Sequence, residues 1–280
     1  MKRRTFLKGA SAFAGLTAFT GLYAWQIEPF WLEFVYKKMP VKGLPDHLEG
    51  KILMQISDMH VGERFDWNYL IDSFKKAQVL NPDFVVYTGD FVHYEDAQQF
   101  TDLRTVLKNA VKGSLGTFAV LGNHDYGHNW AQPEVANTIH EILDRHGIYL
   151  LRNNKVEREG LTFLGIDDYW GTNFNPEKLL LTHDNTRATI ALCHNPDVCD
   201  LDIWNGYDSW ILSGHTHGGQ VKPPFLPSPM LPVKNKTYSQ GLINLEDGRK
   251  LYINRALGCL WQVRLNVRPE ITVFELERTS

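Results

Sequence analysis

Five short polar clusters along the chain hold residue types that commonly bind metal ions. In chain order they read Asp58-x-His60, Gly89-Asp90, Gly122-Asn123-His124-Asp125, the lone His194, and Gly214-His215-x-His217. Each cluster alone is common in turns and helix caps, so the signal lies in their joint order. Imidazole, carboxylate and carboxamide ligands together suit Mn, Fe or Zn better than Ca or Mg. The sequence therefore predicts a metal site, provided that the fold brings the clusters together.

Each cluster directly follows an apolar run that is typical of a buried strand. These runs are residues 51–57, 83–88, 116–121, 188–193 and 209–212. Amphipathic helices are expected over 67–80, 96–111 and 133–146. Alternating strands and helices favour a largely parallel sheet, whose ligand crevice lies at the carboxyl ends of the strands, so we expect the clusters to meet there. A second sheet, stacked on the first, is expected from the second half of the chain, with strands at 148–151, 155–158, 161–166, 188–193, 209–212, 250–254 and 271–276.

The motifs SDMH, GD, GNHD, HNPD and GHTHGGQ occur in this order across roughly residues 50–276 and resemble the calcineurin-like metallophosphoesterase family. The residues of the last two motifs are most similar to those found in a bacterial branch of phosphodiesterases. The resemblance implies an α/β fold, a four-layer α/β/β/α sandwich of two mixed sheets. It also places the catalytic domain at residues 50–280, after a linker and lead-in at 26–49.

The resemblance further implies two divalent metal ions, with Mn²⁺ expected and Fe or Zn as alternatives. Its seven implied ligands are Asp58, His60 and His217 at one metal, Asn123, His194 and His215 at the second, and Asp90 bridging the two. Two such ions can hold a hydroxide between them for in-line attack on phosphorus. His124 is then expected to act as general acid, and Asp125 to orient the His124 ring.

Two arginines near the end of the chain are candidates for binding the substrate phosphate. Arg255 lies in NRALG and Arg268 in VRPE, and both segments resemble parts of the same branch's pattern. The guanidinium fork suits bidentate phosphate binding. A structural role, tying down the C-terminal strand, is the alternative for each.

Several further segments could border the site. Tyr126, His128 and Trp130 follow GNHD and are expected either to line the pocket rim or simply to pack. Cys193 precedes His194, and in an extended segment it should point to the opposite face, into the core. Residues 167–175 and the proline-rich 222–232 are loops that we expect to shape the pocket, and a surface tether is the alternative for the second.

Composition narrows the choice of function. The chain has 280 residues, a formal net charge of -3 and three cysteines, which argues against a nucleic-acid binder and against a disulfide framework. We expect hydrolysis of a phosphodiester or pyrophosphate bond in a small nucleotide-linked or lipid-linked substrate. One alternative is a UDP-2,3-diacylglucosamine-type pyrophosphatase of lipid A synthesis. An alternative of another class is a catalytically silent metal-binding scaffold.

The first 25 residues have the features of an export signal. Lys2, Arg3, Arg4 and Lys8 form a basic start, and no charged residue follows until Glu28. The RRTFLK stretch resembles the twin-arginine motif read by the Tat machinery. We therefore expect export to the periplasm or cell envelope, either as a released protein or anchored by an uncleaved N-terminal helix and so membrane-associated. A cytosolic N-terminal helix is the alternative.

Overall fold

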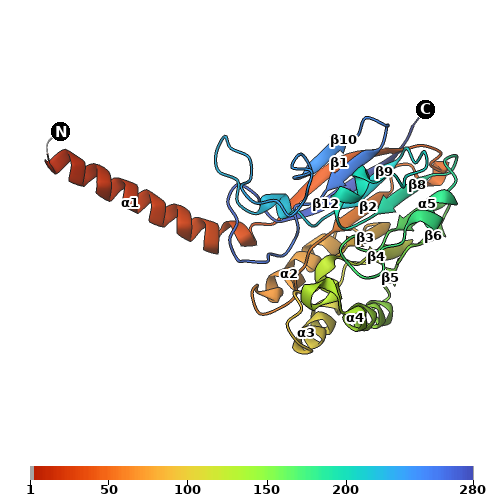
Figure 1. Ribbon diagram of the computed structural model, residues 1–280, viewed down its shortest axis with the longest axis horizontal. Helices are drawn as coiled ribbons and strands as arrows, with labels where there is room; N and C mark the ends of the chain where they lie inside the picture. Colours follow the sequence, from red (N-terminus) through yellow and green to blue (C-terminus); the bar gives the residue numbers. More distant parts are fainter. Residues whose placement is uncertain (1–2, 280) are drawn as a thin grey trace.

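The computed structural model describes residues 3–279, and its body is built on two six-stranded mixed sheets (Figure 1). The first sheet has the order β1 (Glu33–Val41), β12 (Glu270–Arg278), β2 (Ile52–Ile56), β3 (Phe84–Thr88), β4 (Gly116–Val120), β5 (Tyr149–Leu150). The second has the order β10 (Gly241–Asn244), β11 (Lys250–Ile253), β9 (Trp210–Ser213), β8 (Thr189–Leu192), β7 (Leu161–Gly165), β6 (Asn154–Arg158). Only β12–β2, β10–β11 and β6–β7 pair antiparallel among these strands.

Three amphipathic helices cover the outer face of the first sheet. They are α2 (Trp67–Gln78), α3 (Gln98–Leu107) and α4 (Pro133–Arg145). Because side chains alternate along a strand, β3 serves two cores. Val85 and Tyr87 pack under these helices, whereas Phe84 and Val86 pack between the two sheets. Every residue of β3 is buried, which explains its unbroken apolar sequence.

The outer face of the second sheet has a thinner cover. Its core includes Cys193 and Ile211 from the sheet, packed with Leu180 of α5 (Glu177–Leu181) and with Trp204 from a following loop. The layers are therefore α/β/β/α, with a fourth layer made mostly of short helices and loops. This confirms the predicted four-layer sandwich, and it confirms Cys193 as a core residue.

The folded domain begins earlier than the sequence suggested. Residues 26–49 were expected to be a linker, yet β1 pairs with β12 over nine residues, from Glu33–Glu270 to Val41–Arg278. Lys37, Lys38 and Pro40 mask the strand pattern, because β1 is an edge strand with three of its nine residues exposed. The predictions also missed β10 and α5, which are only four and five residues long. The strands expected at 148–151 and 271–276 were assigned to the second sheet, whereas β5 and β12 belong to the first.

Helix α1 (Arg3–Gln26) extends away from the body (Figure 1). Its carboxyl end is attached to the segment that follows β11, because Arg264 N–H donates to the Ala24 carbonyl and Gln262 Nε2 to the Trp25 carbonyl. Lys2 of the expected export motif lies outside the described residues. Among residues 3–279, no helix has the length and apolar character needed to span a bilayer.

Candidate metal centre

The loops after five strands converge, as the sequence predicts. Asp58 and His60 follow β2, Asp90 follows β3, Asn123 follows β4, His194 follows β8, and His215 and His217 follow β9. All seven side chains are buried. The strands come from both sheets, so the site lies at the carboxyl edge that the two sheets share.

Six of these seven residues form two groups, and within each group the potential ligand atoms lie within 4.8 Å of one another. Asp58, His60 and His217 make up one group, and Asp90, His194 and His215 the other. In the first, the Nε2 atoms of His60 and His217 are 2.9 Å apart. In the second, His215 Nδ1 lies 3.2 Å from His194 Nε2. Paired ring nitrogens that face each other in this way suit a cation held between them.

A single oxygen of Asp90 faces both groups. Asp90 Oδ2 lies 3.1 Å from His194 Nε2 and 3.5 Å from His60 Nε2. The other oxygen, Oδ1, accepts the backbone N–H of His124 at 2.9 Å. Asp90 is thus the residue placed to serve two metals.

Asn123 provides an independent test of whether a metal fits here. Its Oδ1 is buried and has no hydrogen-bond partner among the described residues. A buried polar atom without a partner costs about 1–3 kcal/mol. An amide oxygen that accepts no hydrogen bond is free to bind a metal ion. The donor set and this unpartnered oxygen therefore fit the divalent metals that the sequence predicts.

The charges of the site are arranged for a cation. Burial would raise the pKa of Asp58, but the charges of His217 and His194 outweigh it and lower that pKa to about 2. Burial, reinforced by the charge of His194, lowers the pKa of His215 to about 3. Metal ligands must be ionised carboxylates and neutral imidazoles, which are the states that the shifts of Asp58 and His215 favour. His194 differs, because burial would lower its pKa but the charges of Asp90 and Asp58 outweigh burial and raise it, so metal binding would release a proton from His194.

Backbone strain is concentrated at the same positions. Asp58, His60, Asp90, His215 and His217 all have positive φ, at 51°, 47°, 54°, 70° and 52°. Non-glycine residues rarely adopt this conformation, and where they do, strain often marks a functional site.

Glycine is required where two of these loops come close. A Cβ on Gly89, at φ 91°, would lie 2.6 Å from His194 Nδ1. A Cβ on Gly214 would lie 2.2 Å from Asp58 Oδ2. The glycines before Asp90 and His215 therefore allow the ligand loops to approach one another.

His124 lies beside the two ligand groups and next to His93, which the sequence motifs did not single out. Its half-buried ring is 5.0 Å from the ring of His60 and 5.1 Å from that of His93, between centroids. The potential ligand atoms of these three histidines lie within 4.8 Å of one another. Burial, reinforced by the charge of His124, lowers the pKa of His93 to about 4. The available signal was the GDFVH stretch, where His93 follows Asp90 by three residues in the same loop.

Asp125 does not orient the ring of His124 as expected. Its Oδ1 accepts the N–H groups of Phe91 and Val92, at 2.8 and 3.2 Å, and its Oδ2 accepts that of Gly122 at 2.9 Å. Both oxygens of the buried carboxylate thus accept hydrogen bonds from backbone N–H groups of two ligand loops. Asp125 fixes the positions of Asp90 and Asn123 indirectly and has no hydrogen bond to the imidazole.

The residues after GNHD divide between core and rim. Tyr126 is fully buried, and its hydroxyl donates to Asp167 at 2.7 Å. Trp130 stacks on Trp170 with centroids 4.7 Å apart, and Trp170 packs edge-on against His215 at 4.6 Å. The 167–175 loop therefore contacts a predicted metal ligand through Trp170. His128, which is exposed, contacts the Glu95 carbonyl through Nε2 at 3.1 Å.

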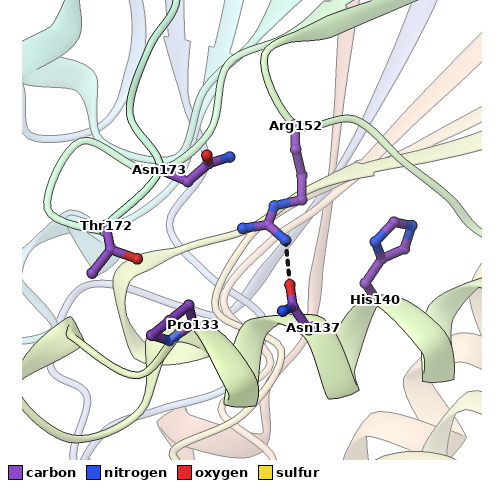
Figure 2. Close-up of a pocket in the computed structure, with 6 residues that line it drawn as sticks. All are labelled: Pro133, Asn137, His140, Arg152, Thr172 and Asn173. Atoms are coloured by element: carbon purple, nitrogen blue, oxygen red, sulfur yellow. Dashed lines mark hydrogen bonds between the residues drawn. The ribbon is translucent and has the colours of Figure 1, made fainter.

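A hollow of about 640 Å³ lies between α4 and the 167–175 loop, and none of the predicted metal or catalytic residues lines it. Figure 2 shows Arg152 reaching over α4 toward Asn137, with His140, Pro133, Thr172 and Asn173 around it. The Arg152 guanidinium also donates to Asp167 and to the hydroxyl of Tyr126. We assign it to holding the 167–175 loop against the segment that carries His124.

Both arginines proposed for substrate binding have structural partners. Arg255 forms ion pairs with Glu270 of β12 and Glu33 of β1. Arg268 donates to the carbonyls of Trp31 and Leu32 and lies over the Trp31 ring. Because these guanidinium groups tie β12 to β1 and to the residues that precede β1, the structure favours the alternative role over phosphate binding.

Comparison with known proteins places this centre in a family context. Residues 52–219 match the family model described as calcineurin-like phosphoesterase. The chain is 29% identical over 291 residues to the uncharacterized metallophosphoesterase YkuE of Bacillus subtilis, covering 100% of this chain and 99% of that protein. It is 28% identical over 280 residues to phosphodiesterase YaeI of Escherichia coli, covering 99% of each. It is 26% identical over 315 residues to UDP-2,3-diacylglucosamine pyrophosphatase LpxG of Chlamydia muridarum, covering 94% of each.

Proposed function

The chain belongs to the calcineurin-like phosphoesterase family and is a hydrolase of phosphoesters; we propose that its substrates are phosphodiesters, cleaved at a centre of two divalent metals. The observation that carries the proposal is the position of Asp90 Oδ2, within 3.5 Å of a histidine from each of the two ligand groups. The unpartnered Oδ1 of Asn123 completes the donor set. Bound divalent ions would supply Lewis-acid stabilisation of the phosphoryl oxygens and lower the pKa of the attacking water.

The ligands are proposed to divide as two sets that share one residue. Asp58, His60 and His217 would hold the first metal, Asn123, His194 and His215 the second, and Asp90 both. Mn²⁺ is the proposed ion at each position, and the same donors would accept Fe or Zn. Metal binding requires the carboxylates to be ionised and the imidazoles to be neutral.

His124 is proposed as the general acid. It follows Asn123 directly, its ring contacts His60, and its backbone N–H is held by Asp90 Oδ1. A proton delivered from this imidazole to the leaving oxygen would complete cleavage of the P–O bond. His93, whose ring also packs against that of His124, is proposed to position it.

A pyrophosphate bond is the second candidate target. Support comes from the similarity to LpxG, which covers 94% of both chains. A silent scaffold is disfavoured, because the full set of seven ligands and the adjacent His124 are present together.

The proposed place of action is the periplasm or cell envelope, reached through the Tat machinery. Support comes from the twin arginines Arg3 and Arg4 at the start of α1, which carries no charged residue from Gly9 to Gln26. Periplasmic fractions of matched Tat-competent and Tat-deficient cells would test this, with Arg3→Lys/Arg4→Lys as the control variant.

The test of the diesterase activity uses the full chain freed of metal and then loaded with Mn²⁺. Bis(4-nitrophenyl) phosphate and 4-nitrophenyl phosphate report diester and monoester hydrolysis separately. We expect metal-dependent turnover of the diester in preference to the monoester. Turnover of the monoester alone would contradict the proposal.

A further inference from the structure

An apolar groove of about 540 Å³ begins at the metal centre itself. His215 and His217 form its inner end, and two loops form its walls. One wall is the proline-rich loop at Pro229–Pro232, and the other is the segment Leu260–Val263. This volume lies within the usual range for small-molecule sites.

The groove presents large apolar side chains to solvent. Met230 is 78% exposed on one wall and Trp261 65% exposed on the other. Large apolar side chains that are exposed together on the surface of a soluble protein often mark a binding site. In Figure 1 the loops that form the two walls lie near the point where α1 joins the body.

The wall that carries Trp261 is held in place. Gln220 Nε2 donates to the carbonyls of Trp261 and Val263, both at 3.1 Å, and its Oε1 accepts the N–H of Leu260. Arg264, which is fully buried, donates to the carbonyls of Ala256 and Gly258 behind this wall. The exposure of Trp261 is therefore fixed by its backbone.

We infer that the groove takes an alkyl chain of the substrate, so that the substrate is an amphiphilic phosphoester. The inference rests on the proposed function, because it is the phosphoester held near His215 and His217 that would direct its chain outward along the groove. The walls consist of Met, Leu, Trp and Val side chains. A polar headgroup alone would bury little apolar surface against them and so would gain little binding free energy. Lys236, which also lines the groove, donates its ammonium protons to the carbonyls of Leu231 and Val233.

The test compares two soluble diesters that differ only in chain length, methyl 4-nitrophenyl phosphate and octyl 4-nitrophenyl phosphate. The Mn²⁺-loaded full chain should favour the octyl substrate in kcat/KM by roughly tenfold or more, because methylenes leave water on binding. Concentrations are kept below the micelle limit of the octyl compound, so that the ratio reports binding of single molecules.

Two variants locate the effect. Met230→Asp and Trp261→Asp each put a charge into the groove and should bring the octyl-to-methyl ratio to within about threefold of one. Phe225→Asp is the matched control, because Phe225 is fully exposed on the same proline-rich loop but does not line the groove. The control should keep the wild-type ratio.

Each contrary outcome has a distinct meaning. Hydrolysis of neither substrate overturns the proposed function and this inference with it. Equal hydrolysis of both overturns the alkyl-chain groove alone and leaves a protein partner or a second copy as its occupant. A high ratio that survives Met230→Asp and Trp261→Asp also overturns the groove as the site of chain recognition.

Discussion

The ring of His215 donates its Nε2 proton to the carbonyl oxygen of Pro232 across 2.9 Å. A carbonyl only accepts, so Nε2 carries the proton and the lone pair is on Nδ1, the atom that faces His194. The proline-rich loop thereby sets the tautomer and orientation of a predicted metal ligand, as outer partners of metal-bound histidines commonly do. The loop borders the centre, which resolves the choice between active-site border and surface tether.

Replacing Asp90 should weaken both metals at once. In Asp90→Asn the negative charge near His194 and His60 is lost, so we expect fewer than one metal per chain after dialysis, in place of two. Elemental analysis of the dialysed protein measures this. Asp102→Asn is the control, because this half-buried acid of α3 contacts Gln98 of the same helix and is no predicted ligand. Two tightly bound metals in Asp90→Asn would contradict the shared position.

Removing the imidazole of His124 should separate catalysis from metal binding. His124→Ala is expected to keep both metals and to lose about 10²–10⁴ in kcat for the diester, the usual contribution of a general acid. His128→Ala removes a nearby exposed imidazole and should change kcat little. Normal turnover by metal-loaded His124→Ala would exclude the proposed role.

His93 should affect the rate through His124. Its ring packs at 5.1 Å from that of His124, so His93→Gln is expected to lower kcat about tenfold, less than direct loss of the acid. Metal content and KM should stay near wild type. The alkaline limb of the kcat–pH profile should also move, because a general acid loses activity as the pH rises through its pKa and the neighbour of His124 has changed. An unchanged profile and rate would mean that His93 only packs.

Asp125 should behave as a structural residue. In Asp125→Asn the amide places N–H donors opposite the N–H groups of Gly122 or Phe91. The variant should lose about 1–3 kcal/mol of unfolding free energy and bind metal more weakly. Thermal unfolding with and without Mn²⁺ measures both. A variant with wild-type stability and metal affinity but much reduced kcat would instead restore the role of orienting His124.

Arg255 should contribute to stability and not to substrate affinity. Arg255→Ala leaves Glu270 and Glu33 without their partner and should cost about 3 kcal/mol, the scale for breaking a largely buried pair. The KM for the diester should stay within twofold of wild type, since no free guanidinium donor is lost from the pocket. A large rise in KM with unchanged stability would contradict this assignment.

The sequence predicted the core of the fold because its strands are buried on both faces. The apolar runs at 83–88 and 116–121 correspond to β3 and β4, and the clusters that follow them converge as expected. Strands with mixed polarity were not found. β1 carries Lys37, Lys38 and Pro40 and pairs with residues more than 230 positions away, so no local pattern indicates it.

The direction in which side chains point could not be predicted from spacing. Asp125 follows His124 directly, yet its carboxylate accepts hydrogen bonds from backbone N–H groups. His93 lies in the same loop as Asp90, and its ring packs against that of His124. Arg255 has the chemistry of a phosphate ligand, and only the three-dimensional structure reveals the two carboxylates that occupy it. Positive φ at the ligand residues is likewise visible only in the folded chain.

The most direct test of the central claim is a Mn²⁺ titration of the metal-free full chain followed by electron paramagnetic resonance. Two ions that share Asp90 should bind with a stoichiometry of two and give an exchange-coupled signal, because the bridging oxygen links their spins. Asp90→Asn should lose that coupling. Binding of a single ion, or of two ions with no magnetic coupling, in correctly folded protein would contradict the shared two-metal centre.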